Sequence, residues 1–298
     1  MKIKRQNVVR ILGFAFAFAC VAEAGLAQTQ PANATPPAGD QGPSTAAMAQ
    51  EASNPFAASS LMQFQQNNNW VEMPFGQEGR VQSNLQFQPL LSVRLTESSM
   101  LIVRPVLTMV NSLPTLDQNG RGDRTTGFGD TVLGFAIPRP FFGGKLMVGA
   151  GPTFIFPTAS DKKLGQDTWQ VGPDLGAVLQ LKNVIAYAFA QQWFKVGGDG
   201  RNTNQMNTVF NVTRVFQNGW TIGTQPTLSV DWEAPEGERV TFPVGVQVGK
   251  MCKCGGTPTL VQVQFQYYAV HPGGAGPKWN VQLQVTPTLA NPIKKALF

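Results

Sequence analysis

The sequence predicts an all-β protein, a transmembrane antiparallel β-barrel of about twelve strands. Three observations predict it: strict alternation of apolar and amide side chains, a low share of charged residues, and the lack of a long apolar run past the N-terminus. Charged residues make up 13% of the 298 residues, while Gly (31), Pro (22) and Phe (20) are plentiful. A soluble domain usually carries about twice that share of charge. A membrane protein without a spanning helix is expected to be a barrel.

The alternation is clearest between Arg239 and Pro287, in three runs separated by turn residues. Their apolar members are Val240, Phe242, Val244, Val246 and Val248; Val261, Val263, Phe265 and Tyr267; and Trp279, Val281, Leu283 and Val285. The positions between them hold mainly Gln, Asn, Thr and Gly, rather than the Lys and Glu of a solvent-exposed sheet face. Because successive side chains of a strand point to opposite faces, each run has one apolar and one amide-rich face. This pattern is typical of a barrel with lipid outside and a polar lumen inside.

The chain divides into three parts. Residues 1–27 resemble a secretory signal peptide, with a basic start, an apolar centre from Ile11 to Val21 and small residues before the expected cleavage site. Residues 28–56 form a Pro/Gln/Ala-rich leader without periodicity, which we expect to be disordered. Residues 57–298 form the barrel. Export from the cytoplasm and a barrel fold together predict the bacterial outer membrane.

The charge balance does not favour nucleic acid as a partner. The formal net charge is +6, and it falls to +3 without the signal peptide. No basic cluster of the remainder is larger than the pair Lys294-Lys295. A nucleic-acid-binding surface needs a larger basic patch. The expected partners are outer-membrane lipid, a small-molecule solute and the barrel-assembly machinery.

Twelve segments are predicted as strands: 61–66, 81–95, 100–110, 128–138, 145–158, 169–181, 184–196, 204–216, 220–232, 239–250, 259–270 and 278–287. An even number returns both chain ends to the periplasm. Tight turns such as Lys182-Asn183 alternate with longer, more charged connections, including 111–127 and 158–168. Short periplasmic turns and longer external loops are expected of such barrels. The run Asn67-Asn68-Asn69 is turn-like and makes the first strand short.

Aromatic residues lie near the expected strand ends, as in the two interfacial girdles of a membrane barrel. They are Trp169, Trp193, Phe216, Trp220, Trp232 and Trp279. Five prolines inside strands predict bulges or kinks, because proline lacks a backbone donor; they are Pro105, Pro152, Pro173, Pro226 and Pro243. One interpretation of these kinks is a lateral opening in the wall.

Alternation also selects candidate residues for the lumen. The charged candidates are Arg94, Arg104, Asp130, Asp174 and Asp231, and the amide candidates include Gln225, Gln247, Gln264 and Gln282. A charge within a membrane segment is costly unless it faces water or a partner. Two interpretations follow: a constriction where Arg and Asp sides create a transverse field, or an internal salt-bridge network that plugs the lumen. The amides would offer hydrogen bonds to neutral solutes or simply fill the barrel.

The sequence predicts neither catalysis nor a cofactor or metal site. The single histidine, His271, lies in a Gly/Pro-rich loop, and no recognisable nucleophilic Ser accompanies it. Cys252 and Cys254 lie in a predicted periplasmic turn, where a strained local disulfide or a soft-metal pair would be alternatives to a purely structural turn. No second pair of ligands completes a zinc site.

A set of short Gly/Pro motifs adds a family resemblance. They are Thr126-Gly127-Phe128-Gly129-Asp130-Thr131, Gly149-Ala150-Gly151-Pro152-Thr153, Phe156-Pro157-Thr158-Ala159 with Leu164-Gly165, and Gly172-Pro173. Further parallels are Gln86-Phe87-Gln88-Pro89 with Ile102-Val103-Arg104-Pro105, Gln191-Gln192-Trp193 before Gly197-Gly198-Asp199, and Val285-Thr286-Pro287. In their order, over roughly 54–288, they resemble the outer-membrane transporter family of the meta-pathway of phenol degradation. The chain departs from that pattern at Cys252-Lys253-Cys254 and in the tail 291–298.

The resemblance implies an outer-membrane barrel that passes small, often aromatic or hydrophobic, compounds, and it assigns no binding residue here. The predicted function is therefore a passive channel for such molecules. The alternative is a structural or surface-interaction barrel with a closed lumen.

Overall fold

The computed structural model describes residues 43–73, 77–116, 122–273, 276–291 and 296. The signal peptide expected at 1–27 and residues 28–42 of the expected leader lie outside the described residues. No helix in the described part of the chain is long and apolar enough to cross a membrane.

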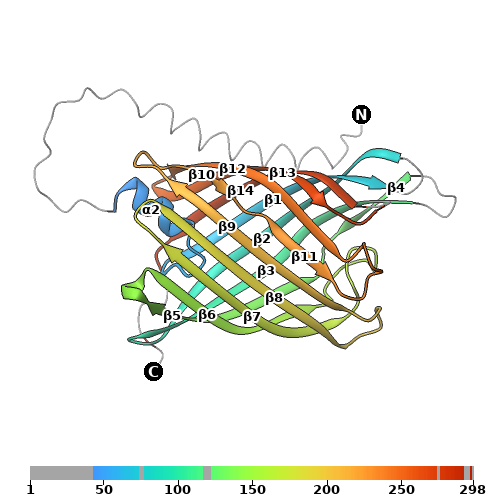
Figure 1. Cartoon of the computed structure of the whole chain (residues 1–298), viewed down its shortest axis with the longest axis horizontal. Helices are drawn as coiled ribbons and strands as arrows, with labels where there is room; N and C mark the ends of the chain where they lie inside the picture. Colours follow the sequence, from blue (N-terminus) through green and yellow to red (C-terminus); the bar gives the residue numbers. More distant parts are fainter. Residues whose placement is uncertain (1–42, 74–76, 117–121, 274–275, 292–295, 297–298) are drawn as a thin grey trace, which may run out of the picture.

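The chain forms one closed antiparallel barrel, and the prediction of about twelve strands is confirmed. The strands are β1 (Ser60–Met73), β2 (Gln77–Thr96), β3 (Ser99–Leu116), β4 (Gly122–Gly127), β5 (Thr131–Phe141), β6 (Leu146–Phe156), β7 (Trp169–Gln180), β8 (Val184–Gly197), β9 (Asn204–Val215), β10 (Trp220–Thr224), β11 (Thr227–Asp231), β12 (Val240–Cys254), β13 (Thr257–Val270) and β14 (Gly276–Leu289). β4 and β5 together make one barrel strand, and so do β10 and β11. Each barrel strand pairs with its neighbours in the sequence and β14 pairs with β1, so the described sheet closes on itself, while β4 pairs with β3 alone (Figure 1).

The two faces of the strands separate as the alternation predicts. On β12 the outward side chains Val246 and Val248 are 48% and 42% exposed, whereas Gln247 between them is 3% exposed. Gln264 of β13 is paired with Gln247 and is 2% exposed. The apolar side chains therefore face the position of the lipid, and the amides face the interior. A closed barrel with this outer belt is the architecture of a bacterial outer-membrane protein.

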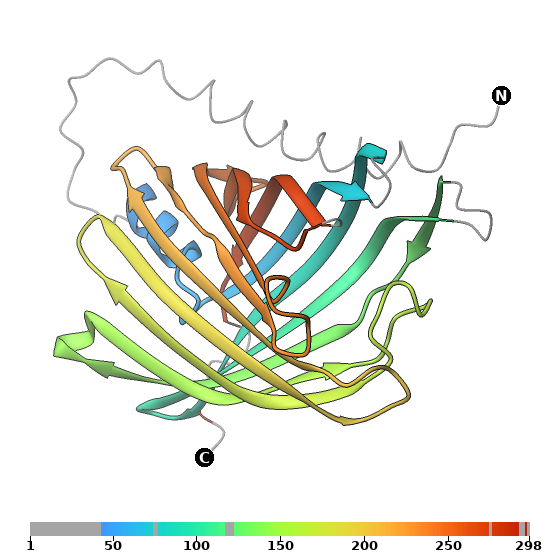
Figure 2. The same ribbon diagram turned by 45° about the vertical axis from the view of Figure 1, so that its right-hand side comes forward.

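Short and long connections gather at opposite ends of the barrel. The short-turn end holds the turns after β2, β7, β9 and β12, the 3-10 turn η2 (Phe142–Gly144) and both ends of the described chain. The connections after β6, β8 and β11 lie at the other end, which we term the long-loop end (Figures 1 and 2). By the usual orientation of such barrels, the short-turn end is periplasmic.

The first strand is longer than predicted. Asn67, Asn68 and Asn69 continue β1 rather than forming a turn. Their amides find partners across the β1–β2 pair, since Asn67 Nδ2 donates to Asn84 Oδ1 at 2.9 Å and Ser83 Oγ donates to Asn68 Oδ1 at 3.0 Å. Cross-strand pairing thus outweighs the turn propensity of asparagine. The predicted connection 111–127 also differs, because β3 and β4 extend the hairpin to Leu116 and Gly122.

Two of the five prolines interrupt the sheet where expected. Pro226 separates β10 from β11, and a register shift lies between Phe242 and Pro243. The missing backbone donor accounts for both breaks. The lateral opening that we inferred from these prolines stays a prediction.

The expectation of disorder in 28–56 is wrong for its last part. Residues Thr45–Ala52 form helix α2, capped by Ser44, whose Oγ accepts a hydrogen bond from the Ala47 backbone N–H at 3.2 Å. Ala49 and Ala52 are buried against the inward side chains Val215, Met251 and Leu260. This packing offsets the entropy of ordering a short helix. Figure 2 shows α2 within the mouth of the short-turn end.

Candidate functional site

The lumen contains a narrow cavity of about 80 Å³ between α2 and the middle of the barrel. Two kinds of side chain line it. The apolar lining includes Phe56, Leu61, Leu90, Ile102, Ala136 and Phe189, and the polar lining includes Gln88, Arg104, Asp174, Tyr187, Gln191 and Gln225. The cavity therefore offers an apolar surface beside a few polar groups, which is the usual composition of a small-molecule site.

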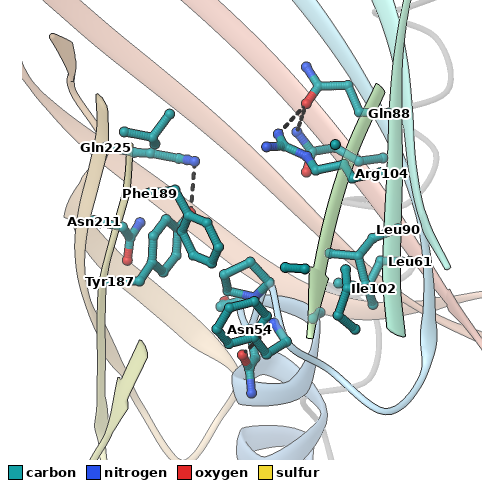
Figure 3. Close-up of a pocket in the computed structure, with 18 of the residues that line it drawn as sticks. Asn54, Leu61, Gln88, Leu90, Ile102, Arg104, Tyr187, Phe189, Asn211 and Gln225 are labelled. Carbon is teal, nitrogen blue, oxygen red and sulfur yellow. Dashed lines mark hydrogen bonds between the residues drawn. The ribbon is translucent and has the colours of Figure 1, made fainter. Parts of the chain in front are cut away.

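The apolar part is built by the segment that follows α2. Phe56 is 2% exposed, and its ring meets Phe189 edge-on with the ring centroids 5.0 Å apart. Gly149 of β6 makes room for this ring, because a Cβ on Gly149 would lie 2.6 Å from Phe56 Cζ. Leu61, Leu90 and Ile102 lie together on one wall, while Tyr187 and Phe189 lie on the facing wall (Figure 3).

Polar contacts fix the same segment to the barrel. Ser92 Oγ donates to the backbone oxygen of Ala57 at 2.5 Å, and Asn54 Nδ2 donates to Gln180 Oε1 at 3.4 Å. Asn54 Oδ1 also accepts from the Phe56 backbone N–H at 2.8 Å. We call the described residues 43–57 the N-terminal seal, since they narrow the periplasmic mouth from within.

Arg104 and Asp174 are the two charged candidates that the structure brings to the cavity. The Arg104 guanidinium donates to Gln88 Oε1 at 2.5 Å, and Asp174 Oδ2 accepts from Gln191 Nε2 at 2.9 Å. They form no ion pair with each other: the pairs between described residues lie at the long-loop end. The described structure thus contains no salt-bridge network across the lumen. Both residues line the cavity, and their role in a constriction stays a prediction.

A glycine leaves room for the Asp174 carboxylate. Gly134 of β5 lies beside Arg104 of β3 in the sheet, and a Cβ on Gly134 would lie 3.0 Å from Asp174 Oδ2. Asp174 is 8% exposed, and its Oδ1 has no hydrogen-bond partner among the described residues. A buried carboxylate oxygen in this state has capacity for a further donor.

The other three charged candidates do not reach the cavity. Asp130 lies at the long-loop end, where its two oxygens accept from the Ala159 and Gln166 backbone N–H groups at 3.1 and 2.7 Å. Asp231 pairs with Arg201 at 2.5 Å at the same end. Arg94 lies exposed at the short-turn end. These three residues therefore lie outside the cavity, because alternation fixes the face of a strand on which a residue lies but not its height in the barrel.

The amide candidates all lie on the inner wall. Gln247, Gln264 and Gln282 are at most 8% exposed. Gln225 lies at the break between β10 and β11, where its Nε2 donates to the Tyr187 hydroxyl at 2.8 Å (Figure 3). Its backbone oxygen accepts from the side-chain amides of Gln264 and Gln266 at 3.0 and 3.1 Å. These mutual bonds fill the wall, which supports the space-filling interpretation for most of the amides.

Sequence reasoning missed two features near the site. The first is the N-terminal seal. The second is Trp193, which we expected in a girdle but which is 3% exposed and donates from Nε1 to Thr153 Oγ1 at 3.1 Å. The odd-numbered residues of β8, including Tyr187 and Phe189, face inward, so Trp193 does as well. The other predicted girdle tryptophans, among them Trp220 and Trp232, are each at least 44% exposed, except Trp279 at 38%.

The remaining residues considered for catalysis or metal binding are the two cysteines and the histidine. Cys252 Sγ and Cys254 Sγ are 3.7 Å apart, longer than the S–S bond of about 2.05 Å, so they are not bonded to one another. His271 follows β13, and its Nδ1 lies 3.0 Å from the Pro272 oxygen. No cluster of three or more potential metal ligands occurs among the described residues.

At the outer rim, Lys278 donates to Glu72 Oε1 at 2.7 Å and holds the pKa of that carboxyl below its ordinary value.

The barrel has solved counterparts. The COG4313 outer membrane channel from Pseudomonas putida F1 superposes with a TM-score of 0.62 at 13% sequence identity, covering 86% of this chain and 100% of that one. Weaker similarity extends to the NanC porin (TM-score 0.47, 9% identity, 76% and 98% covered) and to the toluene transporter TbuX from Ralstonia pickettii (0.44, 10%, 80% and 93%).

No protein-family model and no curated protein matches the sequence. The similarity to solved structures supports the fold of an outer-membrane barrel. The resemblance to the meta-pathway family stays a prediction.

Proposed function

We propose that the protein is an outer-membrane channel that passes small molecules by passive diffusion, with a preference for solutes that have an apolar or aromatic body. The observation that carries the proposal is the mixed lining of the lumenal cavity. An amide-lined water pore would need no buried Phe56, Leu61 or Ile102 and no partly buried Phe189 at its centre. The channel assignment of the most similar solved barrel described above is consistent with this role.

The lining also suggests how such a solute would be held. Its apolar body would contact the Phe56 and Phe189 rings, where aromatic pairs contribute about 0.5–1.5 kcal/mol beyond burial. A hydroxyl or other small polar group would meet Arg104 or Asp174 on the polar side. No energy-coupling motif is visible in the sequence, so the gradient of the solute itself would drive passage.

Blockade of single-channel current in planar bilayers tests the preference. We expect benzyl alcohol to reduce the ion current at lower concentration than a neutral sugar of similar size, because only the former can occupy the apolar wall. Substitution of Phe189 by Ala should remove this difference. Val246→Ala, on the lipid-facing side of β12, is the matched control and should retain it.

A barrel with a closed lumen is the second candidate, and the N-terminal seal favours it. It predicts no ion current from the intact protein and none after removal of residues 43–57. If benzyl alcohol and the sugar block the current equally, the protein is a channel without a preference for apolar solutes, which would contradict the proposal.

A further inference from the structure

The short-turn end of the barrel carries an excess of positive charge. Its described basic residues are Arg94, Arg139, Lys145, Lys182, Arg214, Lys250 and Lys253, and its described acidic residues are Glu51 and Glu97. At the long-loop end acidic residues are far more numerous; those described are Glu72, Asp123, Asp130, Asp161, Asp167, Asp199, Asp231, Glu233, Glu236 and Glu238. Phosphate groups of the periplasmic leaflet therefore meet a basic rim.

Two of these cations are held on the lipid-facing side by aromatic rings. Arg214 of β9 lies over the Phe216 ring, with Cζ 5.3 Å from the ring centroid. Lys250 of β12 lies over the Trp220 ring, with Nζ 5.1 Å from the centroid, and donates to the Asn218 backbone oxygen at 2.8 Å. Cation–π contacts of this kind fix long side chains that would otherwise move freely.

The two cations lie on strands that flank β10. Ile222 of β10 pairs with Arg214 on one side, and Trp220 pairs with Lys250 on the other. A surface groove at this turn is lined by Asn183, Arg214, Val215, Phe216, Gln217, Asn218 and Trp220. No carboxylate of the described chain forms an ion pair with Arg214 or Lys250.

An apolar surface continues from this pair toward the membrane centre. Val212, Ile222 and Val248 point outward from the same three strands and are 54%, 45% and 42% exposed. From the short-turn end, the surface thus begins with the two cations and their aromatic rings, and the aliphatic track follows from Ile222, which pairs with Arg214. A lipid has the complementary order, with a phosphate head and an acyl chain.

We propose that Arg214 and Lys250, with the Phe216 and Trp220 rings, form a site for the phosphate head of an anionic phospholipid of the periplasmic leaflet. The acyl chain lies along Val212, Ile222 and Val248. Arg214 and Lys250 donate to the phosphate oxygens while the rings hold both side chains at headgroup level. The proposal is independent of what the lumen passes.

Native mass spectrometry of the detergent-solubilised full-length protein tests the site, with phosphatidylglycerol and phosphatidylcholine of identical chains as probes. We expect retention of phosphatidylglycerol over phosphatidylcholine. The double variant Arg214→Gln/Lys250→Gln should weaken retention by about fivefold for each cation removed, since a basic residue near an anionic surface contributes about 1 kcal/mol. The charge-preserving variant Arg214→Lys/Lys250→Arg should retain most of the binding.

The matched control is Lys145→Gln/Lys253→Gln, which removes two charges from the same rim at other positions. Circular dichroism of each variant confirms the barrel fold. Equal loss in the control and the test variant would overturn the proposal in favour of a diffuse basic rim. Equal retention of both lipids, or full competition by inorganic phosphate alone, would also contradict a site for an anionic phospholipid.

Discussion

The segments at the two ends of the barrel are held in place by different physical means. At the short-turn end, the N-terminal seal inserts Phe56 and Ala57 among inward side chains such as Leu61 and Ile185, a contact that is mainly apolar. At the long-loop end, backbone groups of the connection after β6 are tied to Asp130 by hydrogen bonds. The seal is a separate segment and can leave without breaking a strand pair, whereas the loop is anchored at both ends by the barrel. This difference makes the periplasmic end the expected point of control.

Among point substitutions, the largest effect on single-channel conductance is expected at Phe56. Phe56→Ala removes a fully packed ring, which costs about 3–5 kcal/mol in comparable sites. Because the seal is only docked, this loss should appear as undocking rather than as unfolding of the barrel. We expect a higher single-channel conductance with an unchanged circular dichroism spectrum.

Gly149 offers the same test from the opposite wall. Gly149→Ala places a Cβ 2.6 Å from Phe56 Cζ and should displace the ring. Overpacking of this kind costs about 1–3 kcal/mol, so the conductance should rise less than in Phe56→Ala. Gly273→Ala, in a loop where nothing lies within 4 Å of the added Cβ, is a control for the substitution itself. An unchanged conductance in both Phe56→Ala and Gly149→Ala would refute the seal as the barrier.

At the opposite end, Asp130→Ala should loosen the loop without opening the seal. The variant loses two bonds to a carboxylate, each of about 1.5–3 kcal/mol at most. We expect faster proteolytic cleavage within 157–168 and little change in conductance. Limited proteolysis of the protein in detergent measures the first, and planar bilayers measure the second.

Asp231→Ala serves as the comparison for Asp130→Ala. Its ion pair with Arg201 is largely exposed, and exposed pairs contribute about 0–1 kcal/mol. Cleavage of the loops should therefore change little. Equal sensitivity of the two variants would show that Asp130 is not the special anchor that its two backbone contacts indicate.

The smallest expected change concerns ion selectivity. Arg104→Ala removes a positive charge from the cavity and should shift permeability modestly toward cations. Arg94→Ala removes the same charge from the exposed rim, where solvent and salt screen it. Reversal potentials in asymmetric salt compare the two. If both variants shift the potential equally, the cavity is not the narrow part of the ion path.

Much of the fold could be predicted because period-two alternation is a local property. Val246 and Gln247 occupy opposite faces because successive side chains of a strand alternate. Gln264 lies on the same face as Gln247 because the two residues are paired across neighbouring strands. The heights of Asp130 and Asp231 could not be predicted in this way, since they depend on strand ends and tilt. The prediction that Trp193 lies in a girdle failed for a related reason. It relied on the position of Trp193 near a strand end and did not use the fact that the odd-numbered residues of β8 face inward.

The N-terminal seal was missed because the average composition of 28–56 is that of a disordered leader. A finer signal was present: Ser44 is a good N-cap, and the following Thr-Ala-Ala-Met-Ala-Gln-Glu-Ala contains strong helix formers. Phe56 is an isolated aromatic after this helix. Its burial depends on Gly149 and Phe189, about a hundred residues away in the chain, and local patterns carry no information about such contacts.

Single-channel recording of a variant without residues 43–57 tests the central claim most directly. A deletion of 28–42 that keeps α2 and Phe56 is its control. If the barrel is a pathway narrowed by the N-terminal seal, the first deletion should raise the conductance several-fold and the second should leave it at the wild-type level. A barrel that stays silent after loss of 43–57 would contradict the account.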